Sequence, residues 1–364
     1  MKIKVLRESL VTAVTVAERI TGKKETLPIL SCVVISVGSS ITVASTNLES
    51  GIKTTLVGEI IEKGIVAVSA SILSQTIRSI RSEYILLKTE DSNLVIESKG
   101  TKTLLKAFPH EEFPNIQAPK KNNIHVETIK FLKSIQSVIY AVSSSMIRPE
   151  IGSIYFVAKG KIITTVATDS FRLAEKTTQK AITEGGGEFL IPLKHALELV
   201  FVVEKIGAHY LDISCEDSQL TVSGEETTYT SRVVDGTFPN YKEIIPTSLK
   251  TEAIILKSDL VDILKKARIF SGADKSIGFH LYPKRKIFSI TARFSDVGEM
   301  SDTLDAALSG DDLDINFHID YVADCLQTID SDSVSLSFAG VGKPLVVRGV
   351  SDSSFLYLVM PLNR

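Results

Sequence analysis

The sequence has no tryptophan, and aromatic residues make up only 7% of its 364 residues. Any hydrophobic core must therefore consist mainly of Ile, Val and Leu. Hydrophobic residues still account for 44% of the chain, which suffices to bury several cores of ordinary domain size. The length by itself favours roughly two to four domains.

An excess of charge of either sign is also missing, since 41 Lys and Arg oppose 43 Asp and Glu and leave a net charge of −2. This balance excludes a globally basic nucleic-acid-binding protein, although charge gathered on one face would still allow DNA binding. No apolar run approaches the roughly 20 residues that span a bilayer, and Met1–Val5 has the alternation of a strand and no apolar signal core. We therefore expect a cytoplasmic protein with no membrane partner.

Clustered metal ligands and catalytic motifs are absent as well. The three cysteines lie far apart and the six histidines stand alone, so neither set has the spacing of a metal site or a redox pair. Gly185–Gly187 lies between Glu184 and Glu188 and lacks a following Gly-Lys-Ser/Thr, which argues against a phosphate-binding loop. We expect no catalytic residue, no metal and no cofactor, and buried free thiols at Cys32, Cys215 and Cys325.

What the sequence does have is an internal repeat. Phe113–Asn115 returns as Phe238–Asn240, 125 residues later. Thr42–Asn47 returns as Thr165–Asp169, which places Asn47 opposite Asp169 after 122 residues, and a weaker third copy, Ser289–Phe294, lies a further 125 residues along. A period near 120 residues in a chain of this length indicates three copies of one domain. We expect domains over residues 1–121, 122–247 and 248–364, with polar linkers at 119–123 and 246–248.

Each copy contains two segments with the apolar spacing of an amphipathic helix, separated by short runs rich in β-branched residues. The predicted helices are Leu6–Thr21, Ala70–Arg81, Thr128–Val142, Pro192–Lys205, Ser258–Phe270 and His318–Ile329. Ser258 is the expected N-cap of its helix. The β-branched runs, for example residues 35–43 and 282–292, are punctuated as antiparallel hairpins are. The predicted fold is α+β, with three repeated modules that each hold two helices and antiparallel sheets.

Four segments resemble one protein family. Val166–Leu173 is similar to the Val-Ala-Thr-Asp-x-x-Arg-Leu signature of the bacterial DNA sliding clamps, the beta subunits of DNA polymerase III. Thr26–Leu30, Asp235–Tyr241 and Tyr357–Leu362 resemble further segments of the same family, in the same order. The resemblance extends over the whole chain and agrees with its length and its threefold repeat.

The resemblance implies a head-to-tail homodimer, whose six domains form a ring around double-stranded DNA. Twelve helices of roughly 10 Å each would give a ring of axes about 38 Å across, with a hole of about 28 Å that admits a duplex. The implied function is that of a processivity factor, which tethers the replicative polymerase subunit to DNA. The clamp loader and repair polymerases would bind the same ring through short clamp-binding peptides.

A sliding contact with DNA requires basic side chains that face the phosphates and read no sequence. Lys24 and Arg148 resemble positions at which sliding clamps contact DNA, whereas Pro149–Glu150 departs from the aromatic residues that some clamps carry there. Ordinary solvent-facing charge is the alternative interpretation of every other basic candidate. These candidates are Lys23, Arg78, Arg81, Lys133, Lys265 and Lys266, and also Lys130, Lys194 and Arg268.

The resemblance also implies a hydrophobic pocket for short peptides near the end of the chain. An apolar run that contains an adaptable Met supports such a pocket independently. Phe171 and Glu243 depart from the His and Arg that are commoner there, so the peptide preference is expected to differ, while Phe355 and Tyr357 are expected in the core. The implied pocket residues are Ile151, Thr168, Ser170, Arg172, Leu173, Pro239, Ile244, Leu358, Val359, Met360, Pro361 and Leu362.

Ring closure would join a strand edge of the first domain to the third domain of a second copy, and two copies would leave no edge free. The implied contacts are Thr103 and Leu105 against Ile269 and Phe270. Two alternatives stay open on the sequence. One is an enzyme that uses carboxylates scattered at domain junctions, and the other is a monomeric peptide-binding scaffold that never encloses DNA.

Overall fold

The computed structural model describes residues 1–22, 27–116, 124–145, 147–179, 181–183, 186–216 and 218–362. The chain forms two units. Unit 1 comprises Met1–Leu132, Ala158–Lys161 and Lys180–Asp235, and unit 2 comprises Lys133–Val157, Ile162–Gln179 and Gly236–Arg364. The boundary between the units therefore lies within the stretch that the sequence predicts as the second domain.

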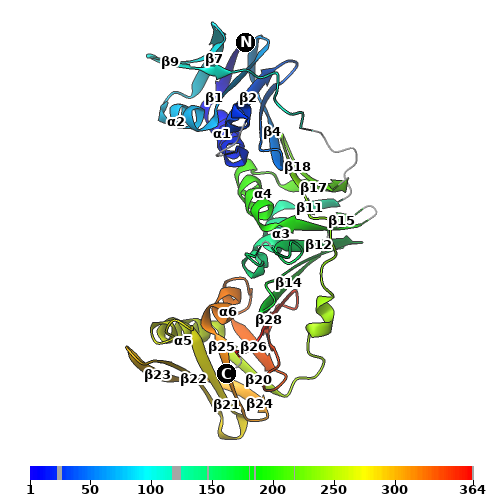
Figure 1. The fold of residues 1–364 in the computed structure, drawn as a ribbon, viewed down its shortest axis with the longest axis vertical. Helices are drawn as coiled ribbons and strands as arrows, with labels where there is room; N and C mark the ends of the chain where they lie inside the picture. The colour runs from blue at the N-terminus through cyan, green and yellow to red at the C-terminus, as the bar shows by residue number, and fades with distance from the viewer. Residues whose placement is uncertain are drawn as a thin grey trace. The chain divides into compact units, whose positions relative to one another are not determined.

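One series of elements occurs three times along the described chain: a strand, a helix, five strands, a second helix and three strands (Figure 1). The first series is β1 (Lys2–Leu6), α1 (Arg7–Ile20), β2 (Cys32–Val37), β3 (Ile41–Thr46), β4 (Ser50–Leu56), β5 (Gly58–Glu62), β6 (Gly64–Ser69), α2 (Ala70–Ser79), β7 (Tyr84–Glu90), β8 (Asn93–Ser98) and β9 (Thr101–Leu105). A short extra strand follows it, β10 (Ala107–Phe108).

The second and third series have the same order of elements. The second is β11 (Ile124–Glu127), α3 (Thr128–Gln136), β12 (Ser153–Lys159), β13 (Ile162–Thr168), β14 (Arg172–Gln179), β15 (Ile182–Thr183), β16 (Gly187–Pro192), α4 (Leu193–Ile206), β17 (Tyr210–Glu216), β18 (Gln219–Gly224) and β19 (Thr227–Arg232). The third is β20 (Thr251–Leu256), α5 (Lys257–Ile269), β21 (Ser276–Tyr282), β22 (Ile287–Phe294), β23 (Gly298–Leu304), β24 (Ala306–Gly310), β25 (Leu313–His318), α6 (Ile319–Asp324), β26 (Ser333–Phe338), β27 (Leu345–Gly349) and β28 (Phe355–Val359). The predicted threefold repeat and α+β class are confirmed.

The strands form antiparallel sheets in both units. Unit 1 holds a five-stranded sheet, β5-β1-β7-β8-β9, and a ten-stranded sheet, β10-β6-β2-β3-β4-β19-β18-β17-β11-β15. Unit 2 holds the strand order β12-β13-β14-β28-β27-β26-β20-β24 and a four-stranded sheet, β23-β22-β21-β25. In unit 1 the two helices of the first series, α1 and α2, pack against each other beside the sheets (Figure 1).

Successive modules are joined edge to edge by equivalent strands. In unit 1, β4 pairs with β19, with Ser50 opposite Ser231. In unit 2, β14 pairs with β28, with Arg172 opposite Val359. β4 and β14 are the third strands after the first helix of their series, and β19 and β28 are the last strands of theirs. The corresponding strands without such a partner are β9 and β23, and each lies at the edge of its own sheet.

Each series begins with a strand that runs directly into its first helix. The first helical N–H groups have no partner within a helix. Here the backbone supplies one, because Arg7 donates to the carbonyl oxygen of Glu83 at 2.8 Å and Thr128 donates to that of His209 at 3.0 Å. Lys257 donates to the carbonyl oxygen of Asp332 at 2.8 Å in the same way. The junction is therefore a repeated feature of the fold.

This junction corrects the predicted N-cap of the fifth helix. The helix begins at Lys257 and its N-cap residue is Leu256, in an extended conformation and without a side-chain cap. The hydroxyl of Ser258 donates instead to the carboxylate of Asp259 at 3.1 Å. A side-chain cap is unnecessary because the backbone carbonyl of Asp332 already accepts the first helical N–H.

The third and sixth predicted helices extend well beyond those observed. The third ends at Gln136, and the short 3₁₀ helix η2 (Ile139–Ala141) follows it. The sixth ends at Asp324 and continues as the 3₁₀ helix η5 (Cys325–Gln327). Apolar residues at 3.6-residue spacing continue through such turns, so the pattern alone does not mark the end of the α-helix. The predicted strand run 35–43 covers the end of β2, a turn and the start of β3, and the run 282–292 covers the last residue of β21, the 3₁₀ helix η4 (Pro283–Arg285) and most of β22.

The three cysteines are free thiols. Cys32 and Cys325 are fully buried, as predicted, whereas Cys215 is partly exposed. Burial raises the pKa of the Cys215 thiol to about 11 and also raises those of the other two. In the described ranges, His, Cys, Asp and Glu nowhere gather as a group of three that could hold a metal ion. No helix among the described residues has both the length and the apolar character needed to span a bilayer.

Candidate functional site

The loop between β13 and β14 in unit 2 is fixed by its own side chains. The carboxylate of Asp169 accepts the N–H groups of Phe171 and Arg172, both at 2.9 Å. The hydroxyl of Thr168 accepts the N–H of Ser170 at 3.1 Å and donates to the carbonyl oxygen of Arg172 at 2.7 Å. Ser170 has a φ of 78°, in the left-handed region that tight turns require. The loop therefore holds Arg172 and Phe171 in defined positions.

The guanidinium of Arg172 connects this loop to two other segments. Its Nε donates to Asp169 at 2.9 Å, a second nitrogen binds the carboxylate of Asp324, and a third donates to the carbonyl oxygen of Tyr140 at 2.6 Å. The side chain is only 12% exposed and lies over the ring of Tyr321, 4.6 Å from its centroid. Burial opposes its charge, but Tyr357 and the carboxylates of Asp324 and Asp169 together outweigh burial and raise the pKa of Arg172.

Aromatic rings line the same site. Tyr321 stacks on His318 at 4.3 Å between centroids and on Phe171 at 6.4 Å. The hydroxyl of Tyr357 donates to the carbonyl oxygen of Tyr321 at 2.8 Å. Burial is the main reason that the pKa of His318 lies below its ordinary value. The site thus combines one buried cation with flat apolar faces, which suits aromatic or aliphatic peptide side chains.

The end of the chain lies along the Arg172 loop. The N–H of Met360 donates to the carbonyl oxygen of Phe171 at 2.8 Å, and that of Leu362 donates to Asn316 at 2.9 Å. Met360 is 38% exposed, whereas Pro361 and Leu362 are half-buried. Other predicted pocket residues are core residues of the adjoining strands: Leu173, Leu358 and Val359, together with Phe355 and Tyr357, for which the sequence predicted a core position.

The segment that carries Pro239 and Ile244 is anchored to β14. The hydroxyl of Tyr241 donates to the carboxylate of Glu175 at 2.5 Å, and burial together with this bond raises the tyrosine pKa. Pro239 and Ile244 are both exposed. Ile151 is buried just before β12, and its carbonyl oxygen accepts the N–H of Ser143 at 3.0 Å. All of the predicted pocket residues belong to unit 2.

The predicted DNA-contact residues do not lie together in one segment of the chain. Lys23 and Lys24 lie outside the described residues. Arg148 is exposed in the turn before β12, and Arg81 is exposed just after α2. Arg78 donates to the hydroxyl of Thr15 at 2.9 Å. These three arginines are accessible to a phosphate group.

The predicted lysines that the structure describes each have an acidic neighbour in their own unit. Lys265 pairs with Asp262 at 3.0 Å and Lys266 pairs with Asp302 at 2.9 Å. Exposed pairs of this kind contribute only about 0–1 kcal/mol, so a phosphate can compete for the lysine. The other ion pairs of candidate residues in the described ranges are Lys133 with Asp330, Lys130 with Glu127, Lys194 with Glu49, Arg268 with Asp320 and Arg78 with Glu18.

The predicted interface residues lie at or near the two sheet edges without a partner. Thr103 and Leu105 belong to β9, but Leu105 is buried and its neighbour Leu104 is 53% exposed. Ile269, the last residue of α5, is 65% exposed, and Phe270 follows it. Side chains alternate along a strand, so the pattern Thr103-Leu104-Leu105 could have indicated Leu104.

Sequence reasoning missed the aromatic and acidic partners of Arg172. Tyr321 and Asp324 are three residues apart, a spacing that puts both on one face of α6. In the structure Asp324 binds Arg172, and Asp320 binds Arg268 and Lys275.

Three family models match the chain in order. The N-terminal, central and C-terminal domain models of the DNA polymerase III beta subunit match residues 1–117, 125–240 and 242–363. The beta sliding clamp of Streptococcus pneumoniae is 25% identical over 364 residues, covering 96% of each chain. That of Vibrio cholerae is 24% identical over 368 residues, covering 100% of each.

Solved structures have the same fold. The DNA polymerase III beta subunit of Thermotoga maritima superposes with a TM-score of 0.93 at 25% identity, covering 100% of this chain and 99% of that one. The DNA polymerase sliding clamp of Bacillus subtilis superposes with a TM-score of 0.94 at 20% identity, with the same coverage. The second likeness concerns the fold alone.

Proposed function

Because this chain belongs to the DNA polymerase III beta subunit family of sliding clamps, we propose that it is a processivity factor that encircles duplex DNA and tethers the replicative polymerase. The observation that carries this proposal is the match of all three domain models in order, over residues 1–117, 125–240 and 242–363 of a chain whose elements repeat three times. Such a factor has no catalysis of its own and acts in the cytoplasm. Its domains are those expected from the sequence, 1–121, 122–247 and 248–364.

The repeated strand pairing supports closure into a head-to-tail dimer. Within the chain, β4 pairs with β19 and β14 pairs with β28. The same rule pairs β23 of one copy with β9 of a second copy, because these are the equivalent strands left at sheet edges. Two copies then close a ring of six modules, and neither β9 nor β23 remains free to add a further copy.

Apolar side chains near these edges support the same closure. Leu104 on β9 and Ile269 at the end of α5 are both more than half exposed in the single chain. A Cβ on Gly298, the first residue of β23, would lie 3.7 Å from the Phe270 ring, so this ring lies beside the strand edge. Thr103 and Leu105 belong to the strand that would face it. Burial of such groups is a normal source of interface stability.

The DNA contact is proposed to be electrostatic and independent of sequence. Arg148, Arg78 and Arg81 are exposed, and Lys133, Lys265 and Lys266 have exposed ion pairs that phosphates can replace. Lys23 and Lys24 remain candidates from the sequence. A near-neutral chain suits this role, because retention on DNA would then depend on the closed ring more than on affinity.

The peptide site is proposed for the surface around Arg172 and the chain end. Phe171 and Met360 are exposed beside the buried Arg172, and Ile244 and Pro239 provide further exposed apolar surface in unit 2. The replicative polymerase subunit, the clamp loader and repair polymerases would bind here through short peptides.

Deletion of Met360–Arg364 should abolish binding of a polymerase clamp-binding peptide and leave the oligomeric state unchanged. Unchanged peptide binding would place the site elsewhere.

The ring is tested by its topology. The protein is loaded onto nicked circular DNA with a clamp loader, and retention during gel filtration is measured before and after a restriction enzyme linearises the circle. A ring stays on the circle and leaves the linear molecule through its ends. Equal retention on both forms would favour the alternative, a monomeric peptide-binding scaffold that does not enclose DNA.

A further inference from the structure

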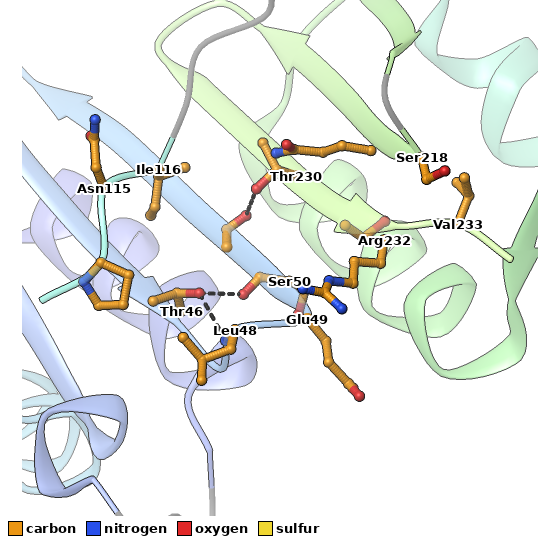
Figure 2. A pocket seen from close by; sticks show the side chains of 14 residues that line it. Thr46, Leu48, Glu49, Ser50, Asn115, Ile116, Ser218, Thr230, Arg232 and Val233 are labelled. Atoms are coloured by element: carbon orange, nitrogen blue, oxygen red, sulfur yellow. Dashed lines mark hydrogen bonds between the residues drawn. The ribbon is translucent and has the colours of Figure 1, made fainter. Parts of the chain in front are cut away.

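The loop that holds Arg172 in unit 2 has a structural copy in unit 1. Between β3 and β4, the side-chain oxygen of Asn47 accepts the N–H groups of Glu49 at 3.0 Å and Ser50 at 2.8 Å. The hydroxyl of Thr46 accepts the N–H of Leu48 at 3.1 Å and donates to the carbonyl oxygen of Ser50 at 2.8 Å (Figure 2). These bonds repeat, one for one, those of the Thr168–Arg172 loop.

The neighbouring strand and helix repeat the arrangement as well. The N–H of Arg232 donates to the carbonyl oxygen of Glu49 at 2.8 Å, as Met360 donates to Phe171. Ser50 donates to Glu198 at 2.8 Å, in the place where Arg172 binds Asp324. Glu198 and Asp324 are each the sixth residue of the second helix of their module. The framework of the proposed peptide site therefore occurs twice in the chain.

The copy in unit 1 borders a cavity of about 480 Å³ (Figure 2). Gly51 stands where unit 2 has Leu173, since each is the second residue of its strand. A Cβ on Gly51 would lie 3.3 Å from the side chain of Ile116 and 3.2 Å from the hydroxyl of Thr230. Because Gly51 has no side chain, Ile116 can lie close to it and line the cavity, which stays open beside it. The volume lies in the range of about 300–1,000 Å³ that is typical of ligand sites.

Leu48 is in an unusual conformation at this cavity. Its φ of 73° lies in the left-handed region, which is unfavourable for a leucine, and its side chain is 53% exposed. Its counterpart in unit 2 is Ser170, which has a φ of 78° and a small polar side chain. Glycine or asparagine would relieve both the strain and the apolar exposure. Backbone strain that persists beside a cavity is a feature of ligand-binding sites.

Two charged residues line the cavity, Glu49 and Arg232, and only Glu49 has an ion pair among the described residues. Glu49 pairs with Lys194 at 2.9 Å, and this bond is the main reason that its pKa is lowered. The guanidinium of Arg232 has no ion pair with any carboxylate of the described ranges, and Figure 2 shows it extending toward the Ser50 side of the cavity. An unpaired guanidinium beside a cavity favours a carboxylate from a partner.

We propose that this cavity is a second docking site, which binds an extended acidic peptide. An aliphatic side chain of the peptide packs against Leu48 and Ile116, and a carboxylate pairs with Arg232. The inference rests on the proposed peptide role of the equivalent loop in unit 2. It differs in chemistry, because the Phe171 and Tyr321 faces of that site are replaced here by Glu49 and His195. The two sites would then bind different partners on one molecule.

The test uses the full-length protein and short fluorescein-labelled peptides that carry one Leu and one Asp at varied spacing in a Ser/Gly background. A matched set carries Lys in place of Asp. Binding is measured by fluorescence anisotropy up to millimolar peptide, and hydrogen exchange locates it. We expect Leu–Asp peptides to protect the amides of 48–51, and Arg232→Glu to weaken binding about tenfold or more, as loss of a charge-assisted contact does.

Two further variants and two controls decide the outcome. Leu48→Asn introduces a residue that tolerates the left-handed region but removes the aliphatic side chain against which the peptide packs. It should therefore weaken binding several-fold. Arg348→Glu changes the same charge on the exposed face of β27 and should have no effect, and neither should deletion of Met360–Arg364. Loss of binding only upon that deletion, equal binding of the Lys peptides, or no bound peptide would each overturn the proposal. Displacement of the peptide by a DNA duplex would show a phosphate site instead.

Discussion

Arg172 joins three segments of unit 2 through a single side chain. Its donors reach its own loop at Asp169, the end of α6 at Asp324 and the carbonyl oxygen of Tyr140. The planar guanidinium has five donors in a fixed arrangement, which a lysine ammonium does not reproduce. Arg172 is therefore best regarded as a positioning residue, which holds the surface that Phe171 and Met360 expose.

Replacement of Arg172 should lower the stability of unit 2. Arg172→Ala leaves two carboxylates without their cation, and we expect the free energy of unfolding to fall by about 3 kcal/mol. Urea titration followed by circular dichroism measures the change. Arg172→Lys should recover part of it, and Arg348→Ala, an exposed arginine, should change stability by less than about 0.5 kcal/mol. A loss for Arg172→Ala no larger than this control would contradict the assigned role.

His318 should make the free energy of unfolding depend on pH. Burial lowers its pKa below the ordinary 6.5, Lys275 and Arg172 act in the same direction, and Asp320 and Asp324 oppose it. The unfolded chain then binds the proton more readily, so the free energy of unfolding falls as the pH drops below about 6.5, until the folded pKa is reached. His318→Gln should flatten this slope below pH 6.5, as measured by urea titration at several pH values. An unchanged slope would exclude His318 as its source.

At the scale of elements, the helices were predictable, but not all of their ends were. The amphipathic pattern located the helix that begins at Arg7 to within a residue, because that pattern reflects which face is buried. The start of α5 at Lys257 depends on a carbonyl group at Asp332, far away in the sequence. No local signal records such a partner.

Ser258 provides a test of this explanation. An N-cap serine contributes about 1 kcal/mol, but the helix here is capped by the backbone of Asp332 and not by the serine hydroxyl. We therefore expect Ser258→Ala to change the free energy of unfolding by less than about 0.5 kcal/mol in urea titration. Thr168→Ala, which removes a hydroxyl with two loop hydrogen bonds, serves as the positive control. A loss near 1 kcal/mol at Ser258 would restore the predicted cap.

The candidate site was predictable only in part, for the same reason. The Thr168–Arg172 segment and the chain end are continuous stretches with a recognisable signature. Tyr321 and Asp324 come from a helix about 150 residues further along, and only the fold brings them to Arg172. The cavity in unit 1 was not predicted either, although the repeat that places Asn47 opposite Asp169 lies in the same loop.

At the scale of the whole molecule, the proposed dimer depends on β9 and β23. Ile269→Asp would bury an unpaired charge in the interface, which costs several kcal/mol, and should give folded monomers. Light scattering should then yield a mass near 39.7 kDa, in place of about twice that value for the unchanged protein. Leu104→Asp should act alike. Val341→Asp, at a residue that is 78% exposed in a loop, is the matched control and should remain dimeric. A dimer that persists in both interface variants would place the contact elsewhere.

The repeated edge pairing has a mechanical consequence for the proposed ring. Of its six joints, four are crossed by a continuous peptide chain and two are held by non-covalent contacts alone, since β4·β19 and β14·β28 lie within each chain and β9·β23 does not. One of the latter joints can part while both chains stay folded and the other joint still holds them together. A circular DNA can therefore enter such a ring through one opened β9·β23 joint, without needing a free end. The stability of a single β9·β23 joint then sets how long the DNA remains enclosed.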